Sequence, residues 1–153
     1  MSEAISGRLT EAGHELDVRI YFEDTDFSGV VYHARYLHFL ERGRSDFLRL
    51  KGFDHRTLME GGFGAPMAFA VRHMEIDFLR PARIDDVVTV ETRTRMVGGA
   101  RILLDQTIRR DDVDLVKAAV KVAVISPQGK PMRMPDGVMS QLAPPAQPAL
   151  TRD

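Results

Sequence analysis

Two acidic residues in one short loop, Asp24 and Asp26, are the side chains whose type and spacing best suit chemistry. The loop follows a run of alternating apolar residues and directly precedes a helical pattern. Free amide N–H groups at a helix start can bind an oxyanion, and the helix dipole adds about half a positive charge there. A carboxylate a few residues upstream can face the same point as a nucleophile or general base. This combination suits acyl transfer.

Spacing alone favours a simpler role for these aspartates. Asp residues before helices are usually caps or turn residues, and one cap stabilises a helix by about 1 kcal/mol. The sequence contains no G-x-S-x-G elbow, no G-x-x-x-x-G-K-[ST] phosphate loop and no H-E-x-x-H zinc motif. Its five histidines show no metal-ligand spacing. We therefore expect neither a metal nor an organic cofactor.

A strand before this loop and a long helix after it must position the two carboxylates. Alternation over residues 16–22 predicts the strand. A helix from about Tyr32 to Leu50 is predicted by residues that share one face: Tyr36, Leu37, Leu40, Gly43, Phe47, Leu48 and Leu50. Gly52 is a stop signal for that helix. Gly43 costs about 1 kcal/mol relative to Ala inside a helix, which predicts a close approach to a neighbouring element.

The remainder of the chain has the patterns of β-structure. After a loop over residues 51–66, alternation predicts four antiparallel strands, with a β-bulge near Arg72-His73 and a hairpin turn at Gly98-Gly99. A helical turn or two follows over residues 136–142. We predict an α+β fold with one domain over 15–142, in which a long central helix packs on a five-stranded antiparallel sheet. Residues 1–14 are expected to be flexible, and the Pro-rich residues 143–153 to be disordered.

Composition and charge exclude several classes of protein. The 153 residues suit one domain. With a net charge of −1, the chain lacks the excess of basic residues that is typical of nucleic-acid-binding proteins. The absence of cysteine excludes disulfides and a Cys nucleophile, and it suits a reducing compartment. With no signal-peptide pattern and no apolar run near the ~20 residues that span a bilayer, we expect a cytoplasmic protein.

The predicted element order also indicates an assembly. One helix cannot cover both faces of the sheet, and the uncovered face is expected to be a large apolar patch, which monomers rarely tolerate. We therefore expect a homodimer, or a larger assembly of dimers.

Residues 23–44 carry a family resemblance. They run E-D-T-D-x-x-G-V-V-Y-H-A-x-Y-L-x-F-x-E-x-x-R and resemble the signature of the 4-hydroxybenzoyl-CoA thioesterase family. Within that family the chain is most similar to the Tol-Pal-associated acyl-CoA thioesterases, and residues 76–82 and 85–87 extend the match. The resemblance implies a hotdog fold, a homodimer that is often a homotetramer, and hydrolysis of acyl-CoA. The acyl group would be short- to medium-chain or aromatic.

The resemblance also implies roles for residues around the loop. Asp26, the second acid of the D-T-D triplet, would be the catalytic carboxylate, and a backbone N–H near His33 would polarise the thioester carbonyl. Gly29 would allow the tight turn, and Tyr32 could contact substrate or pack at the dimer seam. Asp24 is expected to organise the loop. Glu41 is a minor catalytic candidate, because some other hotdog thioesterases carry their carboxylate on the helix.

Four arginines are candidates for binding the CoA phosphates: Arg80, Arg83, Arg95 and Arg101. The aromatic-CoA thioesterase used for comparison has a basic cluster after its third strand, where this chain has Gly98-Gly99-Ala100. An acyl pocket could be lined by Phe27, Tyr36, Met67 and Phe69.

Two alternatives to a thioesterase stay open at this point. One is a hotdog hydratase or dehydratase, which normally needs a catalytic His such as His33 together with an acid on the helix. The other is a non-catalytic module that binds acyl-CoA or acyl carrier protein. The sequence does not distinguish CoA from acyl carrier protein as the carrier of the acyl group.

Overall fold

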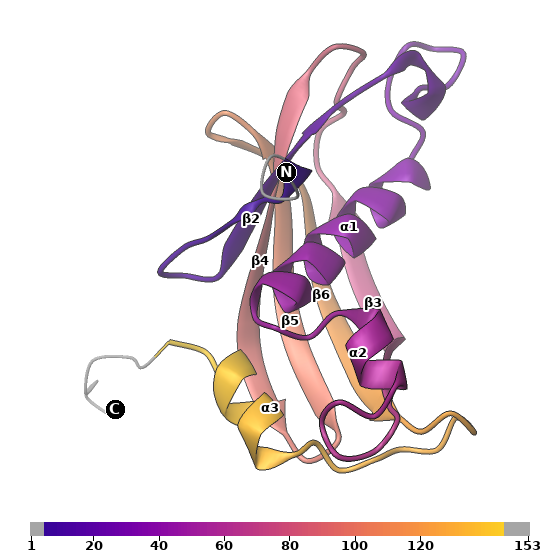
Figure 1. The fold of residues 1–153 in the computed structure, drawn as a ribbon. Helices are drawn as coiled ribbons and strands as arrows, with labels where there is room; N and C mark the ends of the chain where they lie inside the picture. Colours follow the sequence, from indigo (N-terminus) through magenta and orange to yellow (C-terminus); the bar gives the residue numbers. More distant parts are fainter. Residues whose placement is uncertain (1–4, 146–153) are drawn as a thin grey trace.

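The computed structural model describes residues 5–145, which form one six-stranded antiparallel sheet with helices on one face (Figure 1). The strand order is β1-β2-β4-β5-β6-β3. The strands are β1 (Arg8–Leu9), β2 (His14–Arg19), β3 (Ala68–Phe78), β4 (Val87–Gly98), β5 (Arg101–Arg110) and β6 (Val113–Ile125). The helices are α1 (Arg35–Leu50), α2 (His55–Met59) and α3 (Asp136–Leu142). The predicted α+β class is confirmed, with one strand more than expected.

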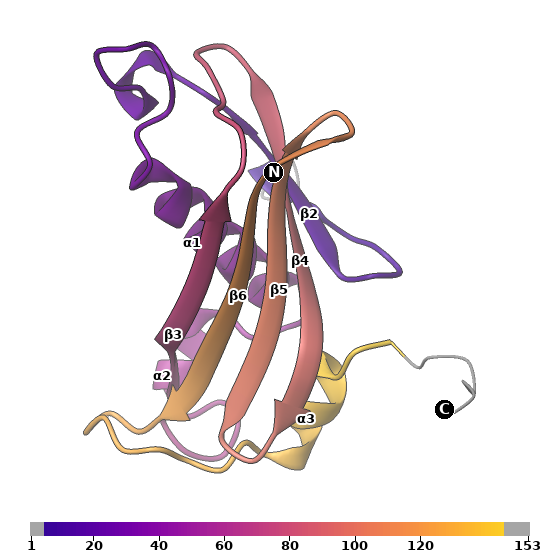
Figure 2. The same cartoon turned by 180° about the vertical axis from the view of Figure 1, so that it is seen from behind.

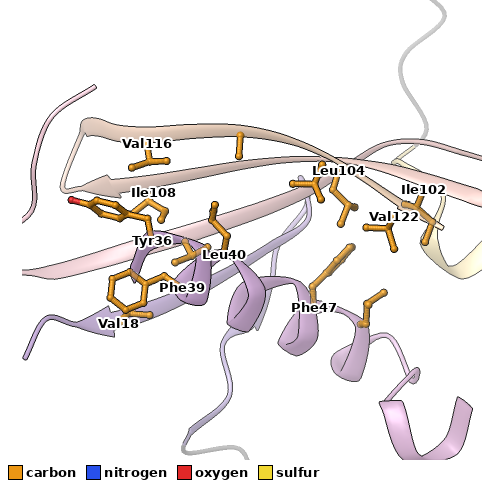
Figure 3. Close-up of a cluster of buried hydrophobic side chains, with 14 of the residues drawn as sticks. Val18, Tyr36, Phe39, Leu40, Phe47, Ile102, Leu104, Ile108, Val116 and Val122 are labelled. Carbon is orange, nitrogen blue, oxygen red and sulfur yellow. The ribbon is translucent and has the colours of Figure 1, made fainter. Parts of the chain in front are cut away.

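Helix α1 packs across the inner face of the sheet and forms the core there (Figure 3). Tyr36, Leu40 and Phe47 point from the helix toward side chains of β5 and β6, among them Ile102, Leu104, Ile108, Val116 and Val122, whereas Phe39 points toward Val18 of β2. Burial of each large apolar side chain stabilises the fold by about 1.5–3 kcal/mol. Leu37 and Leu50 are exposed, so the buried stripe is narrower than predicted.

The start of α1 differs from the prediction. The helix begins at Arg35 rather than near Tyr32, because Tyr32 N–H donates to Asp24 O at 2.9 Å and so belongs to the preceding loop. The predicted end is confirmed at Leu50, and Gly52 follows with a φ of 102°. The short helix α2 lies inside the segment predicted as loop, where the Asp54 side chain caps it by accepting from Thr57 N–H at 3.2 Å.

The long strands follow the predicted pattern. The register of β3 on β6 shifts between Val71 and His73, so the predicted bulge is confirmed. The β4–β5 hairpin turns at Gly99-Ala100, one residue later than predicted, and Gly99 has a φ of 60°. The strand before the acidic loop is shorter than expected. It ends at Arg19, and Phe22 lies exposed in a short 3-10 helix over Phe22–Asp24 instead of facing the core.

The N-terminal segment is attached to α1 by a buried polar cluster. His14 Nε2 lies 2.7 Å from Asp46 Oδ2, and the same oxygen accepts from Gly7 N–H at 2.7 Å. Burial lowers the pKa of His14, although Asp46 opposes the shift. Residues 8–9, within the segment predicted to be flexible, form β1. Of the predicted C-terminal tail, residues 146–153 lie outside the described residues.

The outer face of the sheet is charged, and the prediction that it is an apolar patch is wrong. Figure 2 shows that none of the described helices covers this face. The alternation that turns Val88 and Val90 inward turns Glu91 outward. Arg109 bridges Glu15 at 3.1 Å and Glu91 at 3.2 Å there. Much of the described apolar exposure lies near β3, α1 and the acidic loop, at Phe27, Tyr32, Leu37, Val71, Phe78 and Leu79, although Val87 and Met96 of β4 are exposed as well.

Gly43 is a point of close approach between α1 and the sheet, as its position in the helix predicted. A Cβ atom at this residue would lie 2.7 Å from Val90 Cγ1 and 3.2 Å from Thr92 Oγ1. Ala has the better helix propensity by about 1 kcal/mol, but overpacking a core typically costs about 1–3 kcal/mol. We expect Gly43→Ala to lower the free energy of unfolding by about 1 kcal/mol or more in urea titrations.

Gly137→Ala is the matched control, because Gly137 lies in α3 and a Cβ atom added there would meet nothing within 4 Å. This substitution should leave the free energy of unfolding unchanged or raise it. Equal stability of Gly43→Ala and the wild type would show that the packing cost at this contact does not exceed the gain of about 1 kcal/mol in helix propensity.

Candidate active site

Asp26 lies in the acidic loop and is half-buried there. Its Oδ1 accepts from the N–H of Ser28 at 2.8 Å and from the Ser28 hydroxyl at 2.5 Å. Gly29 N–H donates to Asp26 O at 3.1 Å, and Gly29 has a φ of 87°, so a turn that favours glycine places the carboxylate.

The hydrogen bonds from Ser28 favour the ionised form of Asp26. The Ser28 hydroxyl and then the Ser28 N–H lower the pKa of Asp26 below its ordinary value of 3.8. A carboxyl that must be ionised to act is therefore competent over the whole neutral range.

The Ser28 hydroxyl gives a pH-dependent prediction. Because it stabilises the charged form, Ser28→Ala should raise the pKa of Asp26 toward 3.8, so protonation on acidification begins at a higher pH. The measurement is an NMR titration of the Asp26 carboxyl carbon in both proteins. Asp54 is an internal control, because the Thr57 hydroxyl and N–H lower its pKa in the same way. An unchanged Asp26 titration would show that Ser28 does not bond to it in solution.

Asp24 lies in the same loop, and its contacts are those of a residue that organises it. Asp24 is buried, accepts from Tyr21 N–H at 2.8 Å, and pairs with Arg35 Nε at 3.1 Å. Its backbone oxygen accepts from Tyr32 N–H. The Asp24–Arg35 pair thus joins the loop to the first turn of α1, which fixes Asp26 relative to the helix start.

The helix start offers backbone donors beside the loop. Within residues 5–145, the N–H groups of His33 and Ala34 have no acceptor, whereas Arg35 N–H donates to Tyr32 O at 2.8 Å. The His33 ring lies against Tyr32 and Phe78, with centroids 4.8 Å and 6.0 Å away. A pocket of about 240 Å³ opens here, lined by Val31, His33, Tyr36, Phe78, Leu79, Arg80 and Pro81. The structure therefore brings His33, Tyr36 and Arg80 to one pocket at the end of β3.

Glu41 lies away from this helix start. It is eight residues beyond His33, which corresponds to about 12 Å along a helix. Its Oε2 accepts from the Ser45 hydroxyl at 2.6 Å, and it lines a different pocket of about 130 Å³ between α1, α2 and β3. Within one chain, Glu41 and Asp26 belong to separate sites.

The candidate phosphate-binding arginines have different surroundings. Arg95 is engaged by Asp105 through two of its nitrogens. Arg83 N–H donates to Asp86 Oδ2 at 2.9 Å, and its backbone bridges to Val30. Arg101 lines an outer-face hollow of about 860 Å³ together with Arg72, His73 and Lys121. Arg72 and Lys121 were not predicted as phosphate-binding residues, because only the pairing of strands that are distant in sequence brings them beside Arg101.

The four residues predicted to line an acyl pocket lie in different parts of the structure. Phe27 is fully exposed and Met67 is buried in the core. Tyr36 is buried as well, and its hydroxyl accepts from Ala82 N–H at 2.9 Å. Phe69 lines the pocket beside Glu41. Among residues 5–145 there is no group of three or more His, Cys, Asp or Glu that could hold a metal ion, and none of the described helices has the length and apolar character to cross a bilayer.

Comparison with known proteins gives one consistent class. The model of the thioesterase superfamily matches residues 28–117. The acyl-CoA thioesterase YbgC of Haemophilus influenzae is 44% identical over 131 residues, which cover 85% of this chain and 94% of that protein. The crystal structure of a probable thioesterase from Bartonella henselae is 52% identical with a TM-score of 0.78, covering 81% of this chain and 100% of that one. A Thermus thermophilus thioesterase solved with coenzyme A and zinc is 25% identical with a TM-score of 0.72, covering 84% of this chain and 90% of its own.

The fold and these similarities define a hotdog-fold enzyme that cleaves thioesters. The chain belongs to the thioesterase superfamily, as the signature over residues 23–44 predicted.

Proposed function

We propose that this protein hydrolyses acyl-CoA thioesters with Asp26 as the catalytic carboxylate. The observations that carry the proposal are that Asp26, whose ionised form is favoured, lies in the loop leading into α1, and that the His33 and Ala34 N–H groups at the start of that helix have no acceptor within residues 5–145. The names of the YbgC relative and of the coenzyme A complex supply the substrate class.

The N–H groups and Asp26 have different roles in the proposed reaction. The His33 or Ala34 N–H binds the thioester oxygen as negative charge develops on it. Asp26 then either attacks the carbonyl carbon, giving an anhydride that water opens, or takes a proton from an attacking water. In both routes the C–S bond breaks, the CoA thiolate leaves and is protonated, and the acyl group becomes a carboxylic acid.

We further propose a homodimer that forms through β3. This strand is an edge of the sheet, so its outer side lacks a neighbouring strand within residues 5–145. Val71 and Phe78 on it are 44% and 49% exposed, a degree of apolar exposure that a second copy would cover. In an antiparallel pair of β3 strands about a twofold axis, the Phe78 end of one strand lies beside the Ala68 end of the other.

Such a dimer would complete the active site. Phe69 and Phe78 lie about 30 Å apart along one β3 strand. The pocket of one chain that contains Phe69 would therefore face the Asp26 loop of the second copy, not its own. The Arg72, Arg101 and Lys121 hollow lies near the same end of β3, on the outer face. We propose that these cations bind CoA phosphates in place of the basic cluster that the Gly98-Gly99-Ala100 turn lacks.

Other parts of the proposal rest on fewer observations. We propose that the reaction needs no metal or organic cofactor and occurs in the cytoplasm, where CoA esters are made. Acyl carrier protein is the alternative carrier of the acyl group. The homotetramer and a link to the Tol-Pal system rest on the family resemblance.

The experiment that tests the function is thiol release from a panel of acyl-CoAs, with and without EDTA. We expect release at an unchanged rate after EDTA treatment. Hydration of an unsaturated acyl-CoA without thiol release would instead identify a hydratase, and binding without either reaction would identify a binding module. Loss of activity with EDTA, restored by one divalent metal, would overturn the cofactor-free proposal.

A further inference from the structure

The pocket between α1, α2 and β3 contains a cation that the proposed reaction does not use. This pocket, of about 130 Å³, has an apolar interior formed by Leu48, Phe69, Val71, Ile102, Leu104 and Val122. Its polar rim consists of Glu41, Arg44, Ser45 and His55. About four water-sized groups would fill this volume.

The hydrogen-bond donors of the Arg44 guanidinium are only partly used by the described residues. Its Nη1 donates to Gln106 Oε1 at 3.1 Å, and within residues 5–145 it forms no ion pair with a carboxylate. Burial lowers the pKa of Arg44, while the charge of Glu41 on the next turn opposes that shift. A guanidinium has five N–H donors, so Arg44 retains donors for a further oxygen.

A buried network fixes the direction of Arg44. The Gln106 amide nitrogen donates to Leu40 O at 3.0 Å and to Thr92 Oγ1 at 2.9 Å, which leaves its oxygen for Arg44. The close approach at Gly43 allows Gln106 to reach the helix backbone. The guanidinium is therefore held at the pocket by the core of the protein and not by a flexible surface contact.

We propose that this pocket receives the far end of the acyl group and that Arg44 selects acyl groups carrying a hydrogen-bond-accepting oxygen there, a carboxylate or a hydroxyl. The inference rests on the proposed function, because in the proposed dimer the pocket faces the Asp26 loop of the second copy. The volume suits a chain of about four groups beyond the thioester carbon. Arg44 is thus a specificity-determining residue.

The test compares three acyl-CoAs of equal carbon number: pentanoyl-CoA, 5-hydroxypentanoyl-CoA and glutaryl-CoA. The readout is the ratio of kcat/KM for each oxygenated substrate to that for pentanoyl-CoA. One hydrogen bond to a charged group changes such a ratio by about 10- to 100-fold. We expect wild type to favour at least one oxygenated substrate by that factor, and Arg44→Met to bring the ratio close to unity. Whether glutaryl-CoA or 5-hydroxypentanoyl-CoA ranks first identifies the preferred oxygen.

Arg42→Met is the matched control, because Arg42 is exposed on the same helix and does not line the pocket. It should retain the wild-type ratio. A wild type without preference, or an Arg44→Met variant that retains it, would overturn the inference.

A binding measurement separates this inference from the proposed function. Calorimetry with the same three acyl-CoAs on Asp26→Asn, with and without Arg44→Met, reports the preference without turnover. If wild type releases no thiol from any substrate, the proposed function fails, and the calorimetric preference still decides the role of Arg44.

Mixed dimers test the position of the pocket. When Asp26→Asn and Arg44→Met chains exchange subunits, each mixed dimer contains one site in which Asp26 and Arg44 are both wild type, if the two residues come from different copies. We expect the preference for the oxygenated substrate to reappear in the mixture. Its failure to reappear despite verified exchange would contradict the pocket's placement opposite the second copy.

Discussion

Replacing Asp26 by Asn should lower kcat at least about 100-fold, the effect typical of removing a catalytic base, while the fold stays intact. The amide keeps the size of the side chain and an oxygen that can accept from Ser28, so the loop should keep its shape. It can neither attack a carbonyl nor accept a proton from water. Thiol release under saturating acyl-CoA measures the loss, and circular dichroism and thermal melting verify folding.

Asp54→Asn is the matched control for that result. The Asp54 carboxylate accepts from the N–H and hydroxyl of Thr57 in the same manner as Asp26 accepts from Ser28, but it caps α2. Its substitution should leave kcat near the wild-type value. Glu41→Gln should lose far less activity than Asp26→Asn. A folded but inactive Glu41 variant beside an active Asp26 variant would assign the chemistry to the helix instead of the loop.

A charge on the β3 edge should separate the proposed dimer. We expect wild type to sediment as a dimer, or a multiple of it, at micromolar concentration. Val71→Asp should raise the dissociation constant by about 100-fold or more, because an unpaired charge buried in an interface costs several kcal/mol. Activity should fall as well, because the site takes residues from both copies and because Val71 lines the pocket of about 130 Å³. Sedimentation equilibrium over a concentration series measures the change.

Val113→Asp is the control for that substitution. Val113 is 39% exposed, close to the 44% of Val71, but it lies in β6 beside the β5–β6 turn. It should leave the dimer intact. A wild-type protein that is a stable monomer at micromolar concentration would refute the composite site, and with it the placement of the acyl pocket.

The sequence predicted those elements whose periodicity extends over many residues. The stripe through Tyr36, Leu40 and Phe47 located α1, and a change of alternation phase near Arg72-His73 located the bulge of β3. Local propensity did not predict the structure of segments whose conformation is decided by a single tertiary contact. The Tyr32–Asp24 backbone bond delays the helix start, and the His14–Asp46 pair orders residues that carry no pattern of their own.

The same difference between local sequence patterns and long-range contacts applies to the candidate site. Asp26, Gly29 and His33 are close in sequence, so a single motif could locate them together. The contacts of Arg44 with Gln106, and of Arg72 with Arg101 and Lys121 around one hollow, depend on pairing between distant strands. The number of helices does not determine the polarity of the outer face, which depends on the side chains that alternate along each strand. Thr89, Glu91 and Arg93 already marked that face as polar.

The two edges of the sheet differ greatly in length, which bears on how far assembly can proceed. β3 has 11 residues and β1 has 2. Once two copies pair through β3, each end of the joined sheet consists of the two-residue β1 and the four residues of β2, 16–19, that β1 does not pair, and both stretches are too short to template another chain. Edge-to-edge growth would therefore terminate after a single step instead of propagating into a fibre. We expect concentrated protein to remain free of thioflavin-positive aggregates as long as β1 stays attached to β2.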